Sequence, residues 1–207
     1  MSQFFEIHPD NPQKRLINRA VEILRAGAVI AYPTDSSYAL GCMIGEKDAI
    51  ETIRRIRRLD DKHNFTLMCR DLSEIATYAK VDNSAFRLLK AHTPGPYTFI
   101  FKATHEVPRR LQHAKRRTIG IRVPNHPIAQ ALLEELGEPM MSSTLLLPGA
   151  EYPEVDPHEF RDRLEHELGA IIDGGGCPPE LTTVIDMTEG APQVLRAGLG
   201  SVEALIQ

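Results

Sequence analysis

The sequence predicts an α/β fold, built as a twisted, open, mixed β-sheet with flanking helices. Short apolar runs of β-forming residues alternate along the chain with amphipathic segments of helical period, which is typical of α/β proteins. Glycine- and proline-rich junctions between the segments also permit antiparallel neighbours, so we expect a mixed sheet rather than a purely parallel one. The chain has 207 residues, 42% of them hydrophobic, without an internal repeat or a linker, which predicts one domain over 1–207.

The first expected elements are a helix and a buried strand. The segment 14–26 places its apolar side chains on one face and ends at Gly27, which is typical of an amphipathic helix with a glycine C-cap. An apolar run over 28–32 then suits a strand buried on both faces. Pro33 has no backbone donor, so the pairing of this strand should end there.

A second helix is expected after Gly45, with Asp48 as its cap and isoleucines every three residues along one face. The remaining elements, in chain order, are a strand over 66–69, helices over 72–79 and 84–91, strands over 97–101 and 118–123, a helix over 128–136, a strand over 140–144, a helix over 157–168, and strands over 171–172, 183–185 and 194–196. The glycines at 174–176 predict a turn between the first two of these last strands.

Several predicted strands end in Ser, Thr or Arg. The hydroxyls of Thr34, Ser36 and Ser37 directly follow Pro33, just past the end of a strand. Ligands of open α/β sheets bind outside the strand ends, so these residues predict a polar cleft if the ends lie at one edge of the sheet. An ordinary polar turn is the alternative interpretation of 34–37.

Cationic side chains gather at the end of the second helix. Arg58 and Lys62 lie where the helix gives way to a loop, and fixed guanidinium and ammonium groups suit a polyphosphate. A solvated helix face is the alternative. Arg122 lies inside an otherwise apolar strand, so it must be paired or face a cleft. Arg196, near the last strand, supports the same argument more weakly.

Composition and missing motifs exclude several classes of protein. The net charge of -4 excludes a uniformly basic nucleic-acid binder, and three widely spaced cysteines form neither a disulfide framework nor a zinc site. We therefore expect a cytoplasmic protein, and no signal pattern or long apolar run suggests contact with a membrane. The Walker and Rossmann glycine loops are absent, a serine triad has no support, and the histidines lack ligand spacing, so no dedicated metal site is expected.

An ordered set of short motifs runs through nearly the whole chain. They are Tyr32-Pro33-Thr34-Asp35, the segment 58–62, Thr93-Pro94-Gly95-Pro96, Ile121-Arg122-Val123-Pro124-Asn125-His126-Pro127, Ser142-Ser143-Thr144, Ile172-Asp173-Gly174-Gly175, Thr182-Thr183-Val184-Ile185-Asp186 and Val194-Leu195-Arg196. In this order they resemble the YrdC-like family, whose best-understood members make threonylcarbamoyl-adenylate from L-threonine, bicarbonate and ATP for tRNA modification. The resemblance implies the family's fold, a twisted open sheet with a deep, concave, positively charged cleft.

Carried over residue by residue, the resemblance implies two binding sites. Thr34, Arg122 and Thr182 bind threonine, with Arg122 on its carboxylate. Arg58 and Lys62 are the implied catalytic cations on ATP, which brings Mg²⁺ with it. The implied ATP site is completed by Thr118, Ser142, Thr144 and Arg196.

The implied reaction needs no enzyme nucleophile. The threonine amine captures CO₂ or bicarbonate, the carbamate oxygen attacks the α-phosphate, and pyrophosphate leaves. Positioning and cationic stabilisation of the phosphoryl charge then supply the catalysis.

Two positions depart from the family pattern. The family's Lys-x-Arg is Ile56-Arg57-Arg58 here, and its Ser-x-Asn is Thr144-Leu145-Leu146. Losing one charge-assisted contact to a polyphosphate costs about 1.5 to 3 kcal/mol. Arg57 is a partial replacement for the lysine, whereas nothing obvious replaces the amide. Ile56 has an alternative place in the core, because it continues the three-residue spacing of the helix's apolar face.

The sequence is compatible with three functions. The first is an ATP-dependent nucleotidyltransferase like threonylcarbamoyl-AMP synthase, with reduced or altered activity, acting on a small-molecule substrate. The second is a binding module for double-stranded RNA or tRNA, whose phosphates the cations of 54–62 and 109–117 would contact. The third is a small-molecule sensor that kept the cleft and lost the chemistry. We expect a monomer in each case.

Overall fold

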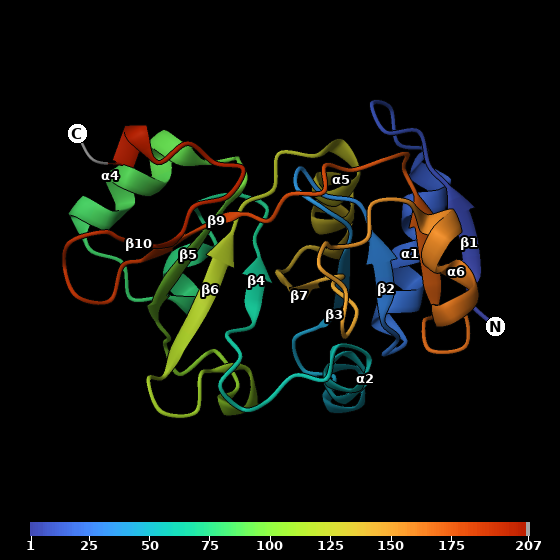
Figure 1. Cartoon of the computed structure of the whole chain (residues 1–207), viewed down its shortest axis with the longest axis horizontal. Helices are drawn as coiled ribbons and strands as arrows, with labels where there is room; N and C mark the ends of the chain where they lie inside the picture. Colours follow the sequence, from blue (N-terminus) through green and yellow to red (C-terminus); the bar gives the residue numbers. More distant parts are fainter. Residues whose placement is uncertain (206–207) are drawn as a thin grey trace.

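Ten strands form one mixed β-sheet in the computed structural model, which describes residues 1–205 (Figure 1). In chain order the elements are β1 (Gln3–Glu6), α1 (Lys14–Arg25), β2 (Ile30–Tyr32), β3 (Ala39–Met43), α2 (Lys47–Arg57), β4 (Thr66–Met68), α3 (Ile75–Tyr78), α4 (Asn83–His92), β5 (Tyr97–Lys102), η1 (Arg109–Leu111), β6 (Thr118–Arg122), α5 (Pro127–Leu136), β7 (Met140–Thr144), α6 (Pro157–Leu164), β8 (Ala170–Asp173), β9 (Thr183–Asp186), β10 (Gln193–Arg196) and η2 (Glu203–Leu205). The order across the sheet is β1-β8-β2-β3-β7-β4-β6-β5-β9-β10, with parallel and antiparallel pairs. The predicted mixed sheet with flanking helices is confirmed.

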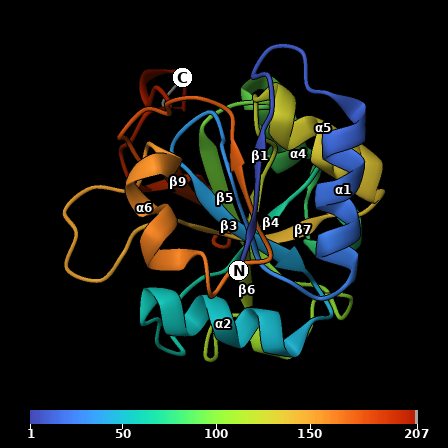
Figure 2. The same cartoon turned by 90° about the vertical axis from the view of Figure 1, so that its right-hand side faces the viewer.

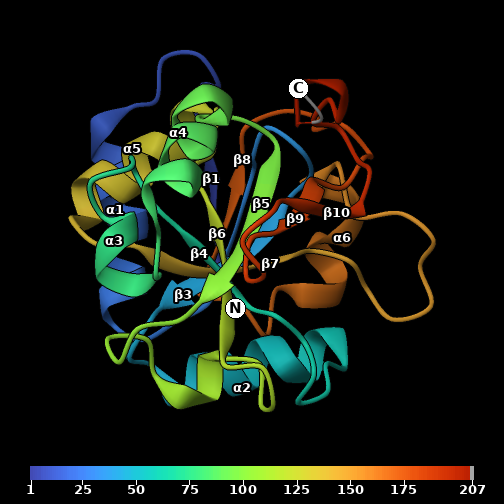
Figure 3. The ribbon, with the colours of Figure 1, turned by 90° about the vertical axis from the view of Figure 1, so that its left-hand side faces the viewer.

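The helices cover the two faces of the sheet around two separate hydrophobic clusters. α1 and α5 pack side by side on one face, where Leu24 and Leu132 are buried against Ile30 (Figure 2). α2 and α6 lie on the opposite face, where Ile53 and Phe160 are buried (Figure 2). α4 packs near β5, at the end of the sheet that carries β9 and β10 (Figure 3). Within residues 1–205 no helix is long and apolar enough to cross a lipid bilayer.

The alternation of side chains along β6 separates the core from the candidate site. Ile121 points into the core, whereas Gly120 and Arg122 point to the other face of the sheet and line the cavities described below. A β-carbon at Gly120 would lie 2.8 Å from Thr66 Oγ1 and 3.2 Å from Thr98 Cγ2. Glycine at this position therefore lets neighbouring strands bring their hydroxyl side chains together over the sheet.

Most predicted boundaries lie within two residues of the observed ones, and the differences have local causes. The strands β1 and β3 were not predicted. α3 spans only Ile75–Tyr78 of the predicted 72–79, because Asp71 accepts a hydrogen bond from the backbone of Ser73 at 2.9 Å and closes a turn instead of a helical turn. The predicted cap Asp48 is wrong, since Glu46 precedes α2 and makes no side-chain cap. α6 ends at Leu164 rather than at 168.

The glycines at 174–176 do not form a turn between neighbouring strands. β8 pairs with β1 and β2, whereas β9 pairs with β5 and β10 in the other half of the sheet. The segment after β8 therefore crosses the molecule to reach β9 (Figure 1). The crossing segment, 174–182, passes beside the turn that follows β2. A contact between the two is the hydrogen bond that the Tyr38 hydroxyl donates to Gly175 O at 2.6 Å.

Candidate functional site

A cavity of about 390 Å³ lies over the face of the sheet that carries Gly120. Its hydroxyl-bearing lining residues come from several strands and the loop before β9, and they are Thr66, Thr98, Ser142, Ser143, Thr144 and Thr182. Its cationic lining residues are Arg57, Lys62 and Arg196. All lining residues lie in the described part of the chain and none of them is acidic. The volume suits a small-molecule ligand, and the side chains suit an anionic one.

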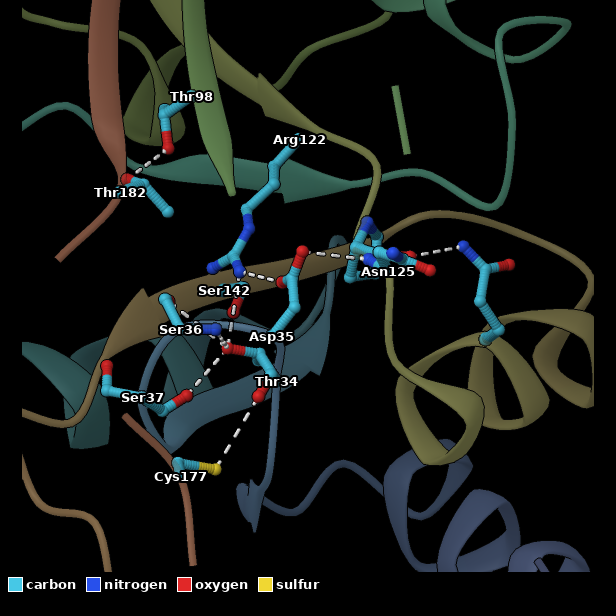
Figure 4. Close-up of polar contacts among 12 residues, drawn as sticks. Thr34, Asp35, Ser36, Ser37, Thr98, Arg122, Asn125, Ser142, Cys177 and Thr182 are labelled. Carbon is cyan, nitrogen blue, oxygen red and sulfur yellow. Dashed lines mark hydrogen bonds and ion pairs between the residues drawn. The ribbon is translucent and has the colours of Figure 1, made fainter. Parts of the chain in front are cut away.

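A smaller pocket of about 30 Å³ adjoins this cavity, because the same six hydroxyl-bearing residues line both. Arg122 forms part of its wall and is only 5% exposed. The Arg122 Nη2 group donates to Thr34 Oγ1 at 3.2 Å and pairs with the Asp35 carboxylate (Figure 4). Asp35 also accepts from the backbone N–H of Asn125 at 3.0 Å. The Arg122 Nε atom is buried and has no hydrogen-bond partner among residues 1–205.

The hydroxyl of Thr34 uses all of its hydrogen-bonding capacity within the protein. It donates to Ser37 O at 2.6 Å and accepts from the backbone N–H of Ser36 at 3.1 Å, which closes the turn after Pro33. Its remaining lone pair accepts from Arg122. The polar turn after Pro33 is therefore part of the wall of the candidate site, and its Thr34 hydroxyl helps to fix the position of Arg122.

Two of the cavity's cations are held by neutral groups. The Arg196 Nε group donates to Thr182 O at 3.0 Å and its Nη2 group to Thr182 Oγ1 at 3.2 Å, while Thr182 Oγ1 lies 2.8 Å from Thr98 Oγ1. The Arg57 Nη1 group donates to Ser143 Oγ at 2.6 Å. Burial, helped by the nearby charge of Arg196, lowers the pKa of Arg57 to about 10. Both guanidiniums are still cationic at neutral pH, and no acidic lining residue neutralises them.

Comparison with known proteins identifies the family to which the chain belongs. Residues 22–198 match the family model Sua5_yciO_yrdC, which is described as "Telomere recombination". The chain belongs to the Sua5/YciO/YrdC family. This outcome confirms the family that the ordered motifs predicted.

Three relatives place the chain within the Sua5/YciO/YrdC family. It is 64% identical over 206 residues to "Uncharacterized protein YciO" of Escherichia coli K12, with 100% of both chains covered. The crystal structure of E. coli YciO has a TM-score of 0.96 and covers 99% of this chain and 100% of that one. "Threonylcarbamoyl-AMP synthase" of Coxiella burnetii RSA 493 is 33% identical over 172 residues, which are 82% of this chain and 90% of that one. The crystal structure of P. abyssi Sua5 complexed with L-threonine is 25% identical, with a TM-score of 0.87, and covers 95% of this chain and 58% of that one.

The structure brings most of the predicted site residues together. Lys62, Ser142, Thr144, Thr182 and Arg196 line the large cavity, Arg122 lines the small pocket, and Thr34 contacts Arg122. Arg58 and Thr118 line neither space. Arg58 is exposed at the end of α2 with a left-handed φ of 53°, and Thr118 is buried, where its hydroxyl donates to Asn64 Oδ1 at 3.0 Å.

Some residues of the site were not predicted from the sequence. Asn64 and Thr98 line the cavity, and Asp35 holds Arg122. Thr98 had a usable signal, since it is the polar residue in an otherwise apolar and aromatic strand and therefore points away from the core. No sequence signal singles out Asn64, which lies in the loop before β4.

The two departures from the family pattern occupy different environments. Ile56 is 9% exposed and belongs to the core cluster on the α2 face of the sheet, so its alternative interpretation as a core residue is confirmed. Leu146 lines the cavity. Only the second departure therefore changes a side chain that faces the cavity.

His63 lines the cavity as a neutral ring. It packs edge-on against Phe65 with ring centroids 5.3 Å apart, and Arg54 lies over the same Phe65 ring. Burial, together with the charges of Arg57 and Arg54, lowers the pKa of His63 from 6.5 to about 4. His63 therefore adds no charge to the cavity at neutral pH.

This depressed pKa predicts a loss of stability in mild acid. Between pH 6.5 and about 4 the unfolded chain takes up a proton at His63 that the folded chain does not, so the free energy of unfolding falls as the pH falls. Urea unfolding at several pH values measures this slope. The variant His63→Gln should show a shallower decline over the same range, and equal slopes in the two proteins would contradict the assignment.

Several cations of the two basic segments predicted to contact RNA, 54–62 and 109–117, already contact other groups of the chain. Arg54 donates to Asp60 O at 3.2 Å and Arg110 O at 3.1 Å. Arg55 pairs with Glu167 at 2.5 Å, and Arg116 pairs with Asp186 at 2.6 Å. RNA binding by these segments stays a prediction, and these contacts leave fewer free cations for it. In residues 1–205 no group of three or more His, Cys, Asp or Glu side chains is placed to hold a metal ion.

Proposed function

We propose that this protein activates a carbamoylated amino acid with ATP, with L-threonine as the amino acid, forming threonylcarbamoyl-adenylate and pyrophosphate. One observation carries the proposal: the pocket at Arg122 adjoins a cavity with three cationic side chains, and six hydroxyl-bearing residues line both. A carboxylate at one end and a polyphosphate at the other would place the reacting groups between them. The identity to threonylcarbamoyl-AMP synthase of C. burnetii supports the same reaction.

Arg122 supports the binding of the amino-acid carboxylate. Its Nε group is fully buried, whereas its Nη1 group makes no hydrogen bond within residues 1–205 and is the donor left for a ligand, in a setting where a charge-assisted hydrogen bond is strong. Asp35 and Thr34 hold the guanidinium from the other side. Thr34 then acts through Arg122, because its own hydroxyl has no capacity left for a ligand.

The hydroxyl-bearing residues shared by the small pocket and the large cavity would position the reacting groups. In the proposed reaction the carbamate oxygen attacks the α-phosphate, the bond from that phosphorus to the bridging oxygen breaks, and pyrophosphate carries the electrons away. The cationic lining of the cavity would stabilise the phosphoryl charge, and Mg²⁺ would arrive with ATP. The adenylate would then serve tRNA modification.

The side chains near the cavity offer no activated nucleophile, which fits a reaction without a covalent enzyme intermediate. Burial raises the pKa of Cys177, beside Thr34, to about 11, so its thiol is protonated at neutral pH. The Ser142 hydroxyl lies 2.6 Å from the Tyr32 hydroxyl and donates to Leu40 O. Burial raises the pKa of Tyr32, which makes this phenol no general base for the serine.

Release of pyrophosphate tests the proposal. Purified protein with ATP and bicarbonate should release pyrophosphate when L-threonine is added, and less with other amino acids. The variant Thr182→Val removes the hydroxyl that holds Arg196 and should lower kcat/KM roughly tenfold. The exposed Thr77→Val is the matched control and should behave as the wild type. Pyrophosphate release that does not depend on any amino acid would reject the proposal.

A further inference from the structure

The end of α2 places three consecutive side chains in three different environments. Ile56 packs in the core, Arg57 enters the cavity, and Arg58 is exposed in the left-handed conformation that ends the helix. From this geometry we infer that Arg57, and not Arg58, is the residue of this segment that contacts the phosphoryl groups of the nucleotide. The inference rests on the proposed function, because it assigns a residue to its ATP site.

Two contacts on one side of the guanidinium fix Arg57. Its Nη1 group donates to Ser143 Oγ at 2.6 Å, and its Nε group donates to the backbone carbonyl of Leu146 at 3.3 Å. The Nη2 group makes no hydrogen bond within residues 1–205, and Arg57 is a lining residue of the cavity. A fixed guanidinium with an unused donor at a cavity is suited to a phosphate oxygen.

The charges around Arg57 favour an anion. Arg196 lies close enough to raise the cost of the positive charge on Arg57, and both guanidiniums are partly desolvated. Both are held by hydroxyl and carbonyl oxygens, and the lining of the cavity contains no carboxylate. A polyanion between the two arginines would remove their mutual repulsion and replace the lost hydration of each.

Leu146 connects this arginine to the second departure from the family pattern. Its side chain lines the cavity without a polar group, while its backbone carbonyl accepts from Arg57. Of the two departures, only Leu146 contacts this guanidinium, through its backbone carbonyl. In this chain a cation anchored on the segment after β7 lies beside the position that lacks the amide.

Binding of inorganic pyrophosphate, measured by calorimetry on the full chain at low ionic strength, tests the inference without requiring turnover. The variant Arg57→Gln should weaken pyrophosphate binding by about ten- to a hundredfold, because one charge-assisted contact is lost. The rival variant Arg58→Gln should change the affinity far less. Arg55→Gln is the matched control on the same helix, since Arg55 is exposed, pairs with Glu167 and does not line the cavity.

A second pair of variants covers the case in which Arg57→Gln does not fold. Arg57→Lys keeps the charge and loses the planar fork, and Ser143→Ala keeps the arginine and removes its anchor. Each should weaken pyrophosphate binding several-fold in a folded protein. ATP should respond to all the variants in the same order as pyrophosphate.

The outcomes separate this inference from the proposed function. A wild-type protein that binds neither pyrophosphate nor ATP would overturn both. A wild-type protein that binds pyrophosphate, with unchanged affinity in the folded Arg57 variants and a large loss in Arg58→Gln, would overturn the inference alone and leave the proposed function standing.

Discussion

Replacing Arg122 by methionine should destabilise the fold by about 3 to 5 kcal/mol, because the variant leaves the Asp35 carboxylate nearly buried without its cation. The same variant should weaken binding of L-threonine by about ten- to a hundredfold or more, since the carboxylate loses a charged partner. Urea unfolding and calorimetric titration with L-threonine measure the two effects separately.

A double variant separates the structural role of Arg122 from its role in binding. Arg122→Met combined with Asp35→Asn removes both charges of the buried pair, so much of the lost stability should return. Threonine binding should stay lost, because the donor for the carboxylate is still missing. A single variant as stable as the wild type, or one that binds threonine normally, would show that Arg122 is neither the structural cation nor the carboxylate ligand.

Ile56→Lys should be the second large effect, with a loss of about 3 to 5 kcal/mol in the free energy of unfolding. Ile56 is 9% exposed within the core cluster, so a lysine there has no partner for its ammonium group. The variant should not improve nucleotide binding, since position 56 does not line the cavity. Thermal or urea unfolding measures the stability, and pyrophosphate titration measures the binding.

Ile56→Met is the control for that experiment, and it should cost less than about 1.5 kcal/mol because it keeps the volume and the apolar character. Leu146→Asn tests the other departure, and it changes a side chain that does line the cavity. A stable Ile56→Lys protein with tighter pyrophosphate binding would mean that position 56 reaches the nucleotide and that the core assignment is wrong.

The sequence carried enough information for the fold because most elements have a strong local period. The apolar spacing of α1 and the alternation in β5 are examples that the structure reproduces closely. β3 had no such signal, since Ala39–Met43 contains no β-branched residue and includes Gly41. The strand conformation of β3 depends on its pairing with β2 and β7, and β7 is distant in the sequence.

The candidate site was predictable as a set of strand ends and less so at single residues. Arg122 follows from a polar residue that interrupts an apolar strand, whereas Thr182 follows only from the family resemblance. The choice between Arg57 and Arg58 depends on where α2 stops, and Arg58 takes the left-handed conformation that glycine usually supplies at a helix end. No local feature of the sequence predicts that conformation for an arginine. The saturation of the Thr34 hydroxyl likewise depends on the turn and on Arg122 together.

We propose that the pocket at Arg122 and the adjoining cavity together hold an amino acid, bicarbonate and ATP. The most direct measurement is mass spectrometry of the products formed by the purified protein with L-threonine, ATP-Mg²⁺ and ¹³C-labelled bicarbonate. We expect an adenylate that contains both threonine and the labelled carbonyl carbon, in yields that fall in Arg122→Met and in Arg57→Gln. A folded wild-type protein that binds ATP and L-threonine yet forms no labelled adenylate would contradict the claim.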